Sequence, residues 1–151
     1  MQRDLAQVVG FSVLIIDGDA KTREDYGRVL RSEGYQVEWA EDGDKGLGLI
    51  KDRPFDLVLL GESIGGLELL KFIHDTHSEV KTILISSYPT VETAVEAMKR
   101  GAYHYMTKPS HAEDILAIVN KGLESKCFQL ETEELQKKRR ARAIEDIKSP
   151  E

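Results

Sequence analysis

Short runs of apolar residues alternate along this chain with segments in which apolar positions recur every three or four residues. The runs have the length and aliphatic content of buried strands, and they cover residues 12–16, 36–40, 56–60, 81–85 and 103–106. The segments between them have the spacing of amphipathic helices. Five short strands that alternate with five helices predict an α/β fold, a doubly wound parallel sheet with helices on both faces.

Capping residues and glycines set the expected helix boundaries, which are about 19–33, 43–51, 66–74 and 91–100. In the fourth helix we expect Val95 and Met98 to face the core. Ser110 and Glu113 form a capping-box pattern that predicts the start of a fifth helix.

The composition changes after Leu123, where Glu, Lys, Arg and Gln dominate. Leu116, Leu123 and Leu130 are spaced by seven residues, which favours a fifth helix that runs on and pairs with a second copy. A single solvated helix held by charge pairs is the alternative. We therefore expect a lead-in over residues 1–10, a globular domain over 11–123 and a charged helical extension over 124–151, as a possible coiled coil or linker.

Charge and cysteine content restrict the partners and the compartment. The 151 residues carry a formal net charge of −6, which argues against nucleic acid as the main partner of the globular part. The basic run over residues 137–142 leaves a nucleic-acid role open as a minor alternative. Cys127 is the single cysteine, which indicates a reducing compartment. No stretch is long enough to span a membrane, and we expect a cytoplasmic protein.

In open parallel sheets the chemistry lies just beyond the carboxyl ends of the strands. The residues expected there are, in strand order, Asp17, Gly18 and Asp19, then Gly61 and Glu62, then Ser86, and finally Lys108. The position at the end of the third strand is therefore a glycine, which has no side chain to contribute.

Three stretches carry a resemblance to a known family. They are VLIID at 13–17, FDLVLL at 55–60 and SSYPTVETAVEAMKRGAYHYMTKP at 86–109. Together they resemble the receiver domain of bacterial two-component response regulators, of the nitrogen-regulator type, over residues 11–123. The resemblance implies a flavodoxin-like, CheY-like fold.

The resemblance also implies a set of functional parts. In the family, an aspartate at the end of the third strand accepts a phosphoryl group, and acidic residues after the first strand hold a magnesium ion. By this resemblance Asp17 is the first acidic residue, Ser86 is the hydroxyl after the fourth strand, and Lys108 is the lysine after the fifth. Tyr105 matches the switch aromatic, whose inward movement carries the signal to the surface of the fourth helix, fifth strand and fifth helix.

Two of these parts are missing here. Gly18 stands where the direct magnesium ligand belongs, and Gly61 stands where the phosphoacceptor belongs. Asp19 follows Gly18, but its position belongs to the start of the helix. The loop after Gly61 is also shorter than the family's acceptor loop, so we expect the magnesium binding of the family to be lost or weak. Lys108 is then expected to pair with Asp17 or Glu62, because an unpaired buried lysine is costly.

Two hypotheses follow from the degenerate pocket. In the first, the chain is a pseudo-receiver that is not an enzyme and needs no cofactor. It acts by contact with a histidine kinase, an effector domain or itself, through the surface of the fourth helix, fifth strand and fifth helix and through the C-terminal helix. In the second, the chain is a phosphorylatable receiver with an unusual acceptor such as Glu62. The chain could also be the regulatory fragment of a DNA-binding transcriptional activator.

Overall fold

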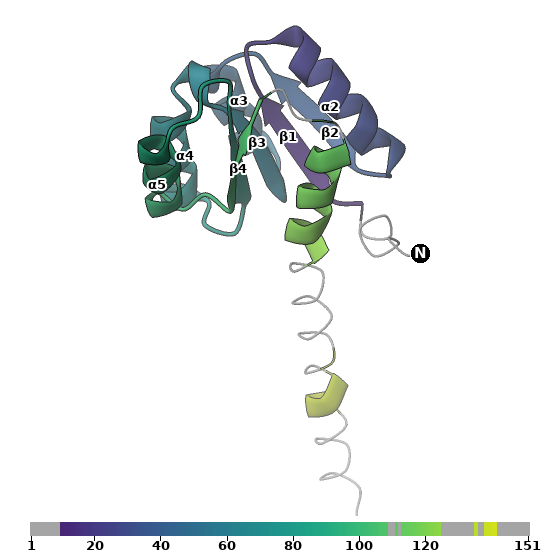
Figure 1. Ribbon diagram of the computed structural model, residues 1–151. Coiled ribbons are helices and arrows are strands. Elements are labelled where there is room, and N and C mark those ends of the chain that lie inside the picture. The colour runs from purple at the N-terminus through teal and green to yellow at the C-terminus, as the bar shows by residue number, and fades with distance from the viewer. Residues whose placement is uncertain (1–9, 109–110, 112, 125–134, 136–137, 142–151) are drawn as a thin grey trace, which may run out of the picture.

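A five-stranded parallel sheet forms the centre of the domain (Figure 1). The computed structural model describes residues 10–108, 111, 113–124, 135 and 138–141. The strands are β1 (Ser12–Ile16), β2 (Gln36–Ala40), β3 (Leu57–Gly61), β4 (Lys81–Ser86) and β5 (His104–Thr107). Their order across the sheet is β2-β1-β3-β4-β5. The predicted doubly wound parallel sheet is confirmed.

Helices cover both faces of this sheet (Figure 1). They are α2 (Ala20–Ser32), α3 (Gly43–Asp52), α4 (Gly66–Thr76), α5 (Val91–Lys99) and a helical segment over residues 113–124, with a short 3-10 turn η1 (Glu62–Ile64) after β3. None of the helices in the described part of the chain has the length and apolar character that crossing a bilayer requires.

The core has two layers, one on each face of the sheet, because successive strand residues point to opposite faces. Ile15 and Leu59 belong to a cluster that α2 and the 113–124 helix cover. Their neighbours Ile16 and Leu60 belong to a cluster that α3, α4 and α5 cover. Both faces are buried, which explains why the strands read as continuous apolar runs rather than as an alternating pattern.

The prediction that Val95 and Met98 of α5 face the core is wrong. Val95 and Met98 are 49% and 52% exposed, whereas Ala97 is fully buried. The small alanine faces the sheet, so the larger apolar residues of α5 point outward. Tyr88 and Val91, just before them in the chain, are 87% and 77% exposed. We call Val91, Val95 and Met98 the α5 stripe.

The helix over residues 113–124 packs on its own domain. Leu123 is fully buried, and Leu116 packs against the same cluster beneath α2. The Tyr35 hydroxyl donates a hydrogen bond to Asn120 Oδ1, which joins this helix to the segment before β2. Leu123 therefore lies in the domain's own core and the half-buried Leu116 packs against it, while pairing with a second copy stays a prediction. Leu130, Ser110 and most of the predicted extension lie outside the described residues.

Replacement of Leu123 by alanine tests this packing. We expect a loss of about 2–5 kcal/mol in the free energy of unfolding, because the truncation leaves a cavity in the core. Leu135→Ala is the matched control: Leu135 is 54% exposed, and its loss is expected to change stability by no more than about 0.5 kcal/mol. Urea unfolding measures both. Equal stabilities for the two variants would contradict the packing described here.

Candidate functional site

The carboxyl edge of the sheet gathers the residues that the sequence singled out. β1 ends just before Asp17, β3 ends at Gly61, β4 ends at Ser86 and β5 ends just before Lys108. All four strands are parallel and adjacent, so their ends meet along one edge. This is the place where parallel α/β sheets hold their functional groups.

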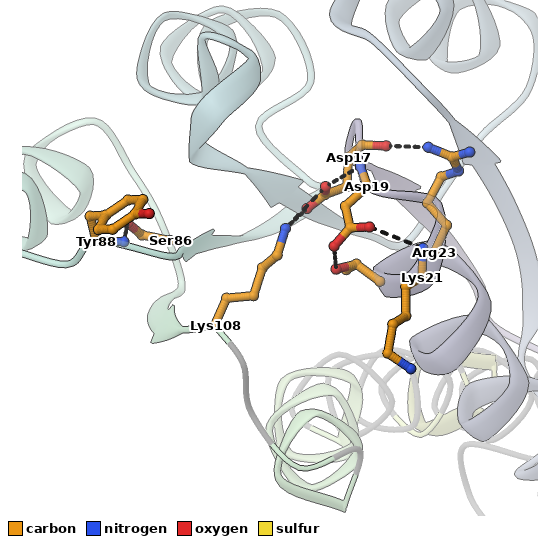
Figure 2. A network of polar contacts seen from close by, with 8 residues as sticks. Asp17, Asp19, Lys21, Arg23, Ser86, Tyr88 and Lys108 are labelled. Carbon is orange, nitrogen blue, oxygen red and sulfur yellow. Dashed lines mark hydrogen bonds and ion pairs between the residues drawn. The ribbon is translucent and has the colours of Figure 1, made fainter.

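Asp17 and Lys108 form an ion pair at this edge (Figure 2). Lys108 Nζ lies 3.1 Å from Asp17 Oδ1 and 3.0 Å from Oδ2. The Asp17 side chain is almost fully buried, and the Lys108 side chain is 14% exposed. A buried carboxylate is tolerated only when it is paired and hydrogen-bonded. Of the two partners expected for Lys108, the structure selects Asp17.

Further hydrogen bonds hold Asp17 in place. Its Oδ1 accepts a hydrogen bond from the backbone N–H of Asp19 at 2.8 Å, and its own N–H donates to the carbonyl of Ala40 at 3.1 Å. The Arg23 guanidinium donates to the Asp17 carbonyl at 2.8 Å (Figure 2). The same guanidinium lies 4.5 Å from the centre of the Trp39 ring, a cation–π distance.

Asp19 belongs to the start of α2 rather than to the buried pair. It is the N-cap residue, and its carboxylate accepts hydrogen bonds from the Lys21 N–H at 3.1 Å and the Thr22 hydroxyl at 2.9 Å. The Thr22 hydroxyl, and after it the Lys21 N–H, hold the pKa of Asp19 below its usual value, because both stabilise the charged form. The expected capping role of Asp19 is confirmed.

Gly61 lies directly against the Asp17 carboxylate. A Cβ atom built on Gly61 would meet Asp17 Oδ2 at 2.6 Å and Cγ at 3.0 Å, which is closer than real Cβ atoms come to other atoms. The backbone of Gly61 has a φ of −74°, which any residue adopts, so the constraint is space and not backbone conformation. The Asp17 carboxylate therefore occupies the volume into which a side chain at position 61 would extend.

The residues at this edge do not fit the magnesium ion that the sequence resemblance implies. Magnesium binds oxygen ligands, and carboxylates are the usual protein contribution. Gly18 has ordinary space around it, since a Cβ added there would lie 3.7 Å from Ile64 Cγ2, but it supplies no carboxylate. Both Asp17 oxygens contact Lys108. Across the described residues, no three Asp, Glu, His or Cys side chains gather as a metal site would need.

Ser86 and Glu62 line a cavity that adjoins the Asp17–Lys108 pair. Ser86 is buried, and its Oγ accepts a hydrogen bond from the Tyr88 N–H at 3.1 Å. Figure 2 shows the Ser86–Tyr88 hydrogen bond and no contact of the Ser86 side chain with the Asp17–Lys108 pair. Glu62 begins η1, and its Oε1 is buried without a hydrogen-bond partner in the described structure. The structure thus brings Asp17, Lys108 and Gly61 together. Ser86 lies beside Lys108 through the backbone, where the Lys108 N–H donates to the Ser86 carbonyl at 2.6 Å, but among the described residues its hydroxyl makes no hydrogen bond to the Asp17–Lys108 pair.

Tyr105 packs against the core cluster under α3, α4 and α5. Its hydroxyl is buried, and no group in the described part of the chain bonds to it. The ring of the expected switch residue therefore points into the protein in this structure.

Sequence reasoning missed Arg23 and Thr22. Thr22 could have been found, because a residue three positions after an N-cap aspartate faces the cap. The contact of Arg23 with the Asp17 carbonyl carried no sequence signal, since it depends on how α2 is rotated on the sheet.

Comparisons with known proteins agree with this architecture. The sequence profile described as "Response regulator receiver domain" matches residues 13–120. The chain belongs to the response regulator receiver family. It is 36% identical over 128 residues to the nitrogen assimilation regulatory protein NtrX of Azorhizobium caulinodans, covering 82% of this chain and 28% of that protein. The receiver chain thus spans little more than a quarter of the length of this curated relative.

Solved structures show the same receiver fold. NtrX from Brucella abortus in complex with ADP superimposes with a TM-score of 0.76 at 33% identity, over 83% of this chain and 29% of that one. A response regulator from Burkholderia pseudomallei has a TM-score of 0.68 at 28% identity, over 84% of this chain and 74% of that one. The Burkholderia structure contains a phosphorylated aspartic acid and a calcium ion.

The close approach at Gly61 predicts the effect of one added methyl group. Gly61→Ala is expected to lower the free energy of unfolding by about 1–3 kcal/mol, because the Asp17 carboxylate must shift to admit the Cβ. Gly48→Ala in α3 is the matched control: a Cβ added there would meet nothing within 4 Å, and we expect a gain of about 0.5–1 kcal/mol. Denaturant unfolding of both variants checks the sign of each change.

The buried ion pair predicts that mutations of its two residues have coupled effects on the free energy of unfolding. Lys108→Met leaves the buried Asp17 carboxylate without its cation and is expected to cost about 3–5 kcal/mol of stability. Asp17→Asn in the same background removes the uncompensated charge, so the double variant should be more stable than the two single losses added together. A double-mutant cycle by urea unfolding measures this coupling, and strictly additive losses would show that the pair does not act as a unit.

Proposed function

We propose that this receiver is a pseudo-receiver, a binding module of a two-component regulator that signals through protein contacts without a phosphoryl group on β3. The single observation that carries the proposal is the Gly61 position. It has no side chain, and the Asp17 carboxylate lies in the space that a side chain would need. A phosphoacceptor aspartate at that site is absent from the sequence, and no free volume remains for one in this arrangement.

The rest of the pocket supports the same conclusion. Gly18 supplies no metal ligand, and Lys108 is neutralised by Asp17 instead of being available to a phosphoryl group. Because these residues offer few oxygen ligands, we propose that magnesium binding is lost or weak. The chain then acts as a binding protein rather than an enzyme, and cytoplasm is the compartment in which receivers of this kind meet their kinases and effectors.

The surface of α5 supports a contact mechanism. Tyr88 and the α5 stripe are exposed apolar residues within one short part of the chain. Large apolar side chains exposed side by side are typical of protein interaction sites. We propose that a histidine kinase, an effector domain or a second copy docks at α5, β5 and the 113–124 helix, with the C-terminal extension contributing to the geometry.

A second candidate is the regulatory part of a DNA-binding transcriptional activator. This candidate is favoured because the chain matches only a small share of the length of its relatives. One such relative, the transcriptional regulatory protein ZraR of Escherichia coli O157:H7, is 33% identical over 114 residues that make up 26% of its length. In that setting the pseudo-receiver would regulate neighbouring domains of the same polypeptide, again by contact.

Intact mass spectrometry tests the pseudo-receiver proposal. The protein is incubated with acetyl phosphate and magnesium, beside a receiver that keeps an aspartate at the end of its third strand. We expect the control receiver to gain a phosphoryl group and this protein to gain none. An added phosphoryl mass on this protein would refute the proposal. Glu62→Gln then decides the alternative acceptor, because phosphorylation that survives this change cannot be on Glu62.

A further inference from the structure

A cavity lies beside the receiver pocket, between η1 and the segment that joins β4 to α5. Its volume is about 290 Å³, and it is lined by Glu62, Ser63, Ser86, Ser87 and Tyr88. The Asp17–Lys108 pair does not line it. The lining residues therefore carry one carboxylate, three serine hydroxyl groups and one tyrosine ring with its own hydroxyl, and they include no cation.

Glu62 is the unusual member of this lining. Its Oε1 is buried from solvent, and no donor in the described part of the chain reaches it. A carboxylate oxygen that is removed from water and left without a donor is unfavourable, and a donor supplied from outside is therefore favoured. The lysine that could have supplied one, Lys108, is held at 3.0–3.1 Å by both oxygens of Asp17.

Tyr88 completes a site for a cation. It lines the cavity and is 87% exposed, and the hydrogen bond from its backbone N–H to Ser86 Oγ holds the main chain that carries the ring at the cavity wall. An exposed tyrosine ring attracts a cation through its negative face. A planar guanidinium matches a carboxylate with two parallel hydrogen bonds and also stacks on aromatic rings, whereas an ammonium does neither as well.

We propose that this cavity receives the guanidinium of an arginine side chain from a protein partner. The Glu62 side chain would turn so that its buried oxygen faces the cavity, and the guanidinium would bond to this carboxylate beside Tyr88. The partner's apolar residues would pack on the α5 stripe, which begins three residues after Tyr88. The net charge of −6 favours a basic partner. This inference specifies the chemistry of the partner in the proposed contact mechanism, and it therefore rests on that proposed function.

Nuclear magnetic resonance titration of the full chain tests the site with a defined probe. N-acetyl-arginine amide is added to ¹⁵N-labelled protein, and N-acetyl-citrulline amide, its neutral analogue, is the matched ligand control. We expect saturable shifts at the amides of residues 62–63 and 86–88 with the arginine probe. We expect the citrulline probe to bind at least about tenfold more weakly, a difference of about 1.4 kcal/mol.

Three variants decide whether Glu62 and Tyr88 form the site. Glu62→Gln is expected to reduce arginine binding to the citrulline level. Tyr88→Ala, at an exposed position that should not disturb folding, is expected to weaken it in part. Glu79→Gln makes the same charge change at the opposite edge of the sheet, before β4, and should leave binding unchanged.

Equal binding of the two probes, shifts confined to residues outside the cavity, or an unchanged response in Glu62→Gln would each overturn the assignment. The result is independent of the phosphorylation experiment. If the protein gains no phosphoryl group and also does not bind arginine, the pseudo-receiver proposal stands and only the arginine site is refuted.

Discussion

The burial of one carboxylate is the constraint on which the functional edge of this domain depends. Asp17 is removed from water, so its oxygens need donors, and Lys108 and the Asp19 N–H provide them. The pair joins the residue after the inner strand β1 to the residue after the edge strand β5, across 91 residues of sequence. Gly61 makes the arrangement possible, because any larger residue would intrude on the carboxylate. The charge network and the missing side chain are thus one structural feature.

The contacts at this edge bear on the roles that the sequence resemblance implies for its residues. By that resemblance Lys108 and Asp17 match a lysine and an acidic position, and in this structure they pair with each other. By the same resemblance Ser86 matches a hydroxyl position; its Oγ accepts a hydrogen bond from the Tyr88 N–H, and the residue lines a cavity with Glu62. Matching residue types at matching positions therefore does not establish matching chemistry, which depends on the contacts that each residue makes.

The sequence predicted most of the fold, for physical reasons that can be named. Strands buried on both faces leave continuous apolar runs, and helix caps such as Asp19 leave short local patterns that are visible without a structure. The prediction for the inner face of α5 was wrong because Ala97, and not the larger Val95 or Met98, packs on the sheet. Small residues allow close packing but carry little hydrophobic signal. Of the leucines spaced by seven residues, Leu123 is buried in the core of the domain, and pairing with a second copy through the residues after it stays a prediction.

The site itself was only partly predictable. The absence of a side chain at position 61 is plain in the sequence, and the Asp17–Lys108 pair was one of two expected solutions. What fills the space beside Gly61 could not be known, because it depends on the position of a carboxylate that comes from another strand. The contact of Arg23 and the orphaned oxygen of Glu62 likewise depend on how helices and loops settle on the sheet.

The backbone on the other side of Gly61 has a consequence for how the pocket can change. A Cβ on Gly66 would lie 2.6 Å from the Gly61 carbonyl oxygen and 2.8 Å from Leu84 Cδ1, so α4 starts in direct contact with the end of β3. An acidic side chain introduced at position 61 would meet Asp17 on one side of a strand that α4 already contacts on the other. A larger residue at this position would therefore require the Asp17 carboxylate to move, and the start of α4 leaves the end of β3 little room to shift in its place.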